Sequence, residues 1–175
     1  MARFAAFLRG VNVGGNNKVP MAELRGLLAN LAYTDVQTVL NSGNAVFSAS
    51  GKADQHARDI RAAILAGIGV DVPVIVKSGI ELEAMAKENQ LAALADNHSR
   101  LFVTVTPGAD SLAELAPIAA LVEAPEKIQL GAHALYLWCS NGVLESKAGA
   151  ALMGKAGRAG TTRNWATMAK VLAVL

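Results

Sequence analysis

The sequence has only one cysteine, Cys139, among its 175 residues. A single thiol cannot close a disulfide within the chain, which fits a reducing compartment. The apolar run from Phe4 to Leu8 is too short for the core of a signal peptide, and Arg9 ends it. No stretch approaches the roughly 18 uninterrupted apolar residues of a membrane helix. We therefore expect a cytoplasmic protein with no membrane partner.

Aromatic and charged side chains are also scarce, at 5% and 17% of the chain, whereas hydrophobic residues make up 53%. This balance supports a large core and excludes disorder. RNA-recognition motifs stack bases on aromatic residues of their sheet. The expected strand at 44–49 has one aromatic residue, Phe47, and lacks the basic-glycine-aromatic signature. The composition argues against a protein that stacks single-stranded RNA on its sheet.

Groups that hold metals or perform covalent catalysis are few. The three histidines and the one cysteine do not share a metal-ligand spacing, so we expect no metal and no cofactor. A nucleophilic Ser42 or Thr162 would have no histidine in its own segment, which leaves Lys18 or Lys155 to assist it. The sequence therefore assigns no catalytic residue, and whether the protein is an enzyme stays open.

The net charge of +2 hides an uneven distribution of charge along the chain. All 14 acidic residues lie between positions 23 and 145. Residues 1–22 carry three basic residues, and residues 146–175 carry five. If the two ends meet in space, they form an electropositive site on an otherwise acidic protein.

Hydrophobic periodicity predicts a ferredoxin-like unit in residues 1–78. Pro20 fits the first turn of a helix that carries Met21, Leu24 and Leu28 on one stripe. The residue types at 41–44 favour a tight hairpin turn. We expect strands at about 3–8, 36–40, 45–49 and 73–77, and helices at about 21–31 and 53–66. This order of strands and helices is that of the ferredoxin-like unit.

The pattern repeats after a connecting helix and loop at 79–98. The second unit, 99–153, has expected strands at 101–106, 127–130 and 134–139, and a helix at about 143–153. Where a fourth strand should follow, residues 154–175 offer a basic, glycine-rich segment and a last helix. The predicted fold class is therefore α+β, a tandem of two ferredoxin-like units, the second lacking a clear last strand and ending in a C-terminal helix.

Two loops of the first unit hold groups that attract anions. The first and second strands of a ferredoxin-like unit run in the same direction, so segment 9–18 and turn 41–44 should emerge at one edge of the sheet. Glycine N–H groups, a helix N-terminus and cationic side chains all favour negative charge. Alternatively, the glycines and asparagines serve only turn geometry. The candidate ligand-binding residues are Arg9, Asn12, Gly14, Gly15, Lys18, Asn41, Ser42, Gly43 and Asn44.

Segment 154–164 is a second glycine-rich, basic stretch that precedes a helix. Its candidate ligand-binding residues are Lys155, Thr162, Arg163 and Asn164, on the same physical grounds. Alternatively, the segment is a surface connector in which Thr162 or Asn164 only caps the helix. Residues 154–157, Gly-Lys-Ala-Gly, also imitate the loop of a KH RNA-binding module, but the match is only four residues long.

Three stretches carry a family resemblance. They are 8–21 (Leu-Arg-Gly-Val-Asn-Val-Gly-Gly-Asn-Asn-Lys-Val-Pro-Met), 41–47 (Asn-Ser-Gly-Asn-Ala-Val-Phe) and 161–167 (Thr-Thr-Arg-Asn-Trp-Ala-Thr). Together they resemble the bacterial domain-of-unknown-function family numbered 1697, over nearly the whole chain. The resemblance implies a tandem ferredoxin-like fold and a cytosolic bacterial protein, and it implies no reaction.

The leading hypothesis is one pocket, formed by segments 9–18, 41–44 and 154–164, that binds a small phosphate-bearing or carboxylate-bearing ligand or a nucleotide. Arg9, Lys18 and Arg163 would supply its charge. Three alternatives stay open: an enzyme acting on a phosphorylated or nucleotide-like substrate, a protein that binds the nucleic-acid backbone, and a structural or protein-interaction module. The sequence does not indicate an oligomeric state.

Overall fold

The computed structural model describes residues 1–175 and divides into two compact units. The first unit comprises Met1–Leu82 and Lys170–Leu175, and the second comprises Glu83–Ala169. Helix α3 (Gly79–Glu88) therefore begins in the first unit and ends in the second. No helix has the length and apolar character needed to cross a membrane.

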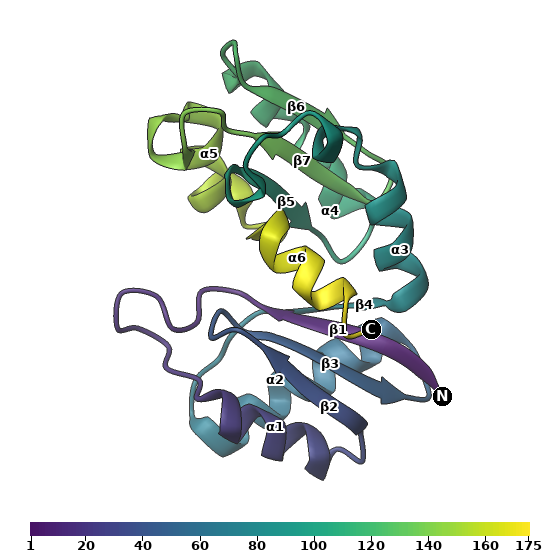
Figure 1. The fold of residues 1–175 in the computed structure, drawn as a ribbon. Helices are drawn as coiled ribbons and strands as arrows, with labels where there is room; N and C mark the ends of the chain where they lie inside the picture. Colours follow the sequence, from purple (N-terminus) through teal and green to yellow (C-terminus); the bar gives the residue numbers. More distant parts are fainter. The chain divides into compact units, whose positions relative to one another are not determined.

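The first unit contains one four-stranded antiparallel sheet in the order β2-β3-β1-β4 (Figure 1). Its elements follow the expected order along the chain. They are β1 (Ala2–Leu8), α1 (Met21–Asn30), β2 (Thr34–Val39), β3 (Asn44–Ala49), α2 (Ala53–Ile68) and β4 (Val74–Ser78). Strand β4 lies at the edge of the sheet, which suits the proline at position 73 because proline cannot donate to a neighbouring strand.

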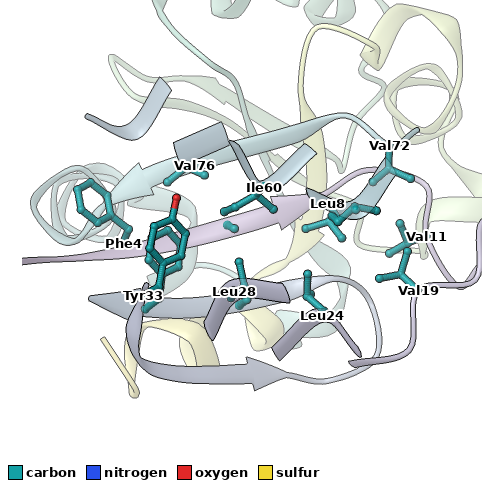
Figure 2. Packing of buried hydrophobic residues seen from close by; sticks show 14 of the residues in the cluster. Phe4, Leu8, Val11, Val19, Leu24, Leu28, Tyr33, Ile60, Val72 and Val76 are labelled. Atoms are coloured by element: carbon teal, nitrogen blue, oxygen red, sulfur yellow. The ribbon is translucent and has the colours of Figure 1, made fainter. Parts of the chain in front are cut away.

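Successive side chains of β1 point to opposite faces of the sheet, and the side chains on one face pack against the helices of the unit. Phe4, Ala6 and Leu8 are buried in the core that also holds Leu24 and Leu28 of α1. Figure 2 shows side chains from the start of the chain and from α1 facing one another across this core. Residues near the first loop occupy one end of the cluster, and aromatic residues occupy the other end (Figure 2).

A buried histidine lies among those aromatic residues. The rings of Tyr33 and Phe47 stack with their centroids 4.4 Å apart, and the ring of Phe4 lies edge-on to His56 at 4.8 Å. His56 is only 4% exposed; its Nδ1 lies 2.8 Å from the Tyr33 hydroxyl, and its Nε2 has no hydrogen-bond partner. Burial lowers the pKa of His56 below the usual value of 6.5, although Asp59 and Asp54 oppose this shift.

We expect the stability of the first unit to fall between pH 7 and pH 5 because of His56. The unfolded chain takes up the proton first, so the free energy of unfolding decreases as the pH falls below about 6.5, by up to about 1.4 kcal/mol per pH unit. Urea unfolding followed through the NMR signals of β1 amides measures this slope. The variant His56→Gln should flatten the slope, whereas His98→Gln, at an exposed site, should keep it. An unchanged slope in His56→Gln would contradict the assignment.

The second unit also contains a four-stranded antiparallel sheet, in the order β6-β7-β5-β8. Short 3₁₀ turns connect several of its elements. Its strands and helices are β5 (Leu101–Val105), α4 (Ala109–Ala113), β6 (Lys127–Leu130), β7 (Ala134–Trp138), α5 (Lys147–Met153), β8 (Thr161–Asn164) and α6 (Trp165–Leu172). Cys139 is fully buried beside Leu135 and Leu137, as expected from its strand face.

The prediction that the second unit lacks a last strand is wrong. Strand β8 pairs with β5 along its whole length, from Thr161 opposite Val105 to Asn164 opposite Phe102. The hydroxyl groups of Thr104 and Thr162 also lie 2.8 Å apart across the pair. The Thr-Thr-Arg-Asn sequence of β8 has no alternation of apolar and polar residues, and as an edge strand it pairs on one side only. Hydrophobic periodicity therefore could not detect it.

The helix expected at 143–153 begins later than predicted. Residues Val143–Glu145 form a 3₁₀ turn, and α5 begins at Lys147. The side chain of Ser146 caps α5 by accepting a hydrogen bond of 2.9 Å from the N–H of Gly149. Ser146 is buried, and the cap gives its hydroxyl oxygen a hydrogen-bond partner inside the unit.

Candidate functional site

The first loop contains a small hairpin of its own. Val13 and Asn16 form an isolated bridge, in which the Asn16 N–H donates to the Val13 carbonyl over 3.1 Å. Gly14 and Gly15 form the turn between them, with φ angles of +60° and +79°. This left-handed conformation suits a two-residue hairpin turn, and glycine adopts it without strain. The two glycines therefore have a geometric role, whatever else they bind.

The amide of Asn12 holds the loop to the rest of the unit. Its Nδ2 donates to the Val19 carbonyl over 3.0 Å and to the Asn41 carbonyl over 2.6 Å. Its Oδ1 accepts a hydrogen bond of 2.9 Å from the Val19 N–H. Both hydrogens of the amide are thus used within the chain. Asn12 was predicted to bind a ligand, and the structure gives it the role of joining segment 9–18 to turn 41–44.

The turn at 41–44 lies against the end of β1, as the sheet topology predicts. The Leu8 N–H donates to the Gly43 carbonyl over 2.8 Å. Asn44 is buried, and its Nδ2 donates to the Val39 carbonyl and to the Ser42 hydroxyl, each over 2.9 Å. The side chains of Ser42 and Asn44 therefore stabilise the turn itself.

A pocket of about 410 Å³ lies where the two segments meet. Lys18 is the one charged residue in its wall, and its ammonium group makes no hydrogen bond or ion pair within the chain. Arg9 does not line the pocket. It is half-buried and follows β1, and its backbone N–H donates to the Pro73 carbonyl over 3.0 Å. Of the cations expected to supply charge, Lys18 is the one that lines this pocket. The lining residues are Asn12, Gly15, Lys18, Val19, Pro20, Met21 and Asn41.

Three apolar lining residues were not predicted as site residues. Val19, Pro20 and Met21 run from the loop into the start of α1. Pro20 marked the helix start in the sequence, and Met21 was assigned to the helix stripe. No feature of the sequence distinguishes a stripe residue that lines a pocket from one that only packs in the core.

The candidate residues of segment 154–164 belong to the second unit, and none of them lines this pocket. Lys155 is exposed on a 3₁₀ turn, Lys155–Gly157. Arg163 donates to the Thr161 hydroxyl over 2.9 Å and to the Thr162 carbonyl over 3.0 Å. Burial lowers the pKa of Arg163 to about 10, so this side chain still carries its charge at neutral pH. That these residues bind a ligand stays a prediction.

Asn164 has a defined structural role. Its Oδ1 accepts a hydrogen bond of 2.8 Å from the Thr167 N–H, in the first turn of α6. This bond satisfies one of the N–H groups that a helix leaves unpaired at its start. Asn164 therefore caps α6, and that it also binds a ligand stays a prediction.

Two basic residues near the chain ends are already engaged with their own unit. The Lys147 ammonium forms an ion pair of 2.5 Å with Glu123. Arg3 donates to the Asp35 carbonyl over 3.1 Å and to the Val174 carbonyl over 2.5 Å. The uneven distribution of charge along the sequence thus overstates the number of cations that remain for a ligand.

Comparisons with known proteins show a similar structure and a family, and the description of neither names an activity. The conserved bacterial protein SP0830 from Streptococcus pneumoniae has a similar structure, with a TM-score of 0.82 and 25% sequence identity over 99% of this chain and 98% of that one. No curated protein matches the chain. Residues 1–136 match the family described as "Protein of unknown function (DUF1697)". The chain belongs to the DUF1697 family.

Proposed function

We propose that the pocket between segment 9–18 and turn 41–44 binds a small ligand with an anionic group, a phosphate or a carboxylate. Lys18 carries this proposal because it is the one charged group in the pocket wall and has no partner within the chain. An ammonium group without an ion pair is available to a ligand, and a charge-assisted hydrogen bond is stronger than a neutral one.

The surroundings of Lys18 also favour an anion. Gly15 also lines the pocket, and its backbone N–H makes no hydrogen bond within the chain. Met21 begins helix α1, and Pro20 before it offers no side-chain cap. The first N–H groups of a helix lack intrahelical partners and attract negative charge. A volume of about 410 Å³ also falls in the range of small-molecule sites.

Removal of the Lys18 charge should weaken anion binding by about 10-fold to 100-fold, because a hydrogen bond to a charged group contributes roughly 1.5–3 kcal/mol. Titration of wild type and Lys18→Gln with inorganic phosphate and with a nucleoside monophosphate, followed by NMR, measures this loss. Lys52→Gln is the matched control, since Lys52 is exposed after β3, at the opposite end of the sheet. Equal affinities in all three proteins would overturn the proposal.

We also propose that each unit is a ferredoxin-like fold. The strand orders β2-β3-β1-β4 and β6-β7-β5-β8 and the antiparallel pairing of neighbouring strands support this topology. The protein acts in the cytosol, supported by a single cysteine that is buried and carries no disulfide.

A further inference from the structure

The pocket offers more apolar contact than polar contact. Val19, Pro20 and Met21 form one stretch of its wall. Asn12 has already donated both of its amide hydrogens to carbonyl groups of the chain. The wall residues that still offer polar donors are Lys18, through its ammonium group, Asn41, through its side-chain amide, and Gly15, through its backbone N–H. An inorganic anion would satisfy such donors and leave the apolar wall in contact with water.

Leu40, next to the pocket residue Asn41, has a conformation that its residue type disfavours. Its φ angle is +58°, in the left-handed region where a Cβ atom is strained. Asparagine, aspartate or glycine tolerates this region better, and three of the five non-glycine residues with positive φ are indeed asparagine or aspartate. Leucine is the one large apolar residue among them.

The strain at Leu40 is not explained by core packing. Its side chain is 48% exposed, so it gains little from burial in the unit. Backbone strain that the core does not require is typical of positions that contact a ligand. Val13, in the neighbouring hairpin, is also a large apolar residue and is 68% exposed. Val13 in segment 9–18 and Leu40 just before turn 41–44 thus both present apolar side chains to solvent.

We infer that the ligand is a small amphipathic molecule, with an apolar group attached to the anionic group. The inference rests on the proposed function, because it places the anionic group at Lys18. The apolar group lies against Pro20 and Met21 and extends to Leu40. The geometry thus favours an alkyl or aryl phosphate or carboxylate over an inorganic anion.

A series of alkyl phosphates tests this inference. Inorganic phosphate, methyl phosphate, butyl phosphate and octyl phosphate are titrated below their micelle-forming concentrations, with NMR detection. The dissociation constant should fall by about fourfold for each methylene group that becomes buried, which is the ratio expected from the free energy of transferring a methylene out of water. The gain in affinity with chain length should stop once the alkyl chain is longer than the pocket and its rim.

The variant Leu40→Asn tests the role of the strained residue. Asparagine tolerates the left-handed conformation, so the fold should be kept or stabilised. The affinity for octyl phosphate should fall several-fold, and the affinity for methyl phosphate should not change. Leu144→Asn is the control, because Leu144 is 94% exposed and belongs to the second unit. Its affinities should equal those of wild type.

The outcomes separate the inference from the proposed function. If all four phosphates bind with equal affinity and Lys18→Gln weakens each of them, the inference fails and the proposed function stands. If no phosphate binds, both fail. Binding only to vesicles that contain anionic phospholipid, with none to soluble alkyl phosphates, would overturn the small-molecule ligand. If Leu40→Asn leaves the affinity for octyl phosphate unchanged, Leu40 does not contact the alkyl group.

Discussion

The substitution Gly43→Ala is expected to destabilise the first unit by about 3 kcal/mol, the sum of left-handed backbone strain and overpacking. Gly43 has a φ angle of +82°, and a Cβ atom there would lie 2.6 Å from Val11 Cγ2 and 2.8 Å from Leu8 Cβ. Neither neighbour can move freely, since Leu8 and Val11 are both buried in the core. Turn 41–44 would have to move away from β1, and the pocket would open.

Urea unfolding followed through the NMR signals of β1 amides measures this effect in the first unit alone. Gly26→Ala is the matched control. Gly26 lies in the exposed part of α1, and a Cβ atom there would meet nothing within 4 Å. Alanine is favoured over glycine in a helix by about 0.5–1 kcal/mol, so this variant should be more stable than wild type. Equal stability of the two variants would show that the turn does not require glycine.

The substitution Asn12→Asp should disconnect the first loop from the turn. The carboxylate would face the Val19 and Asn41 carbonyl groups, which now accept hydrogen bonds of 3.0 Å and 2.6 Å. Two hydrogen bonds would be replaced by repulsion between oxygen atoms, at a cost of about 2–4 kcal/mol to the local structure. We expect the amides of 10–18 to exchange with solvent much faster than in wild type, as measured by hydrogen exchange.

Asn17→Asp is the matched control, because it introduces the same carboxylate into the same loop. Asn17 donates one hydrogen bond, to the Gly10 carbonyl over 3.3 Å, at an exposed site. Its loss should change the exchange rates of the loop only slightly, since exposed polar contacts are weak. The assignment of Asn12 as the joining residue would be wrong if both variants accelerated exchange equally.

The sequence predicted the elements of the first unit because hydrophobic periodicity and turn residues agree there. Strand β8 of the second unit was missed because Thr161, Thr162, Arg163 and Asn164 pair through their backbone and present no apolar face. The late start of α5 was missed because Val143 and Leu144 continue the apolar pattern into a 3₁₀ turn. Periodicity detects burial, and it does not detect backbone pairing at an edge.

For the candidate site, the sequence predicted only that two segments of the first unit lie side by side. Topology alone places segment 9–18 beside turn 41–44, and the hydrogen bond between Asn12 and Asn41 confirms this. The roles of single residues depend on contacts between positions about 30 apart, which residue type does not reveal. Counting cations also overestimated the charge of the pocket, because Arg9 does not contribute to its wall.

A titration of ¹⁵N-labelled protein with butyl phosphate tests the central claim most directly. If the pocket binds the anion, the largest shifts of amide signals should fall on Gly15, Lys18, Met21 and Asn41, and Lys18→Gln should need a higher ligand concentration to reach the same shifts. Largest shifts in segment 154–164, or no shifts at millimolar ligand, would contradict the proposed site.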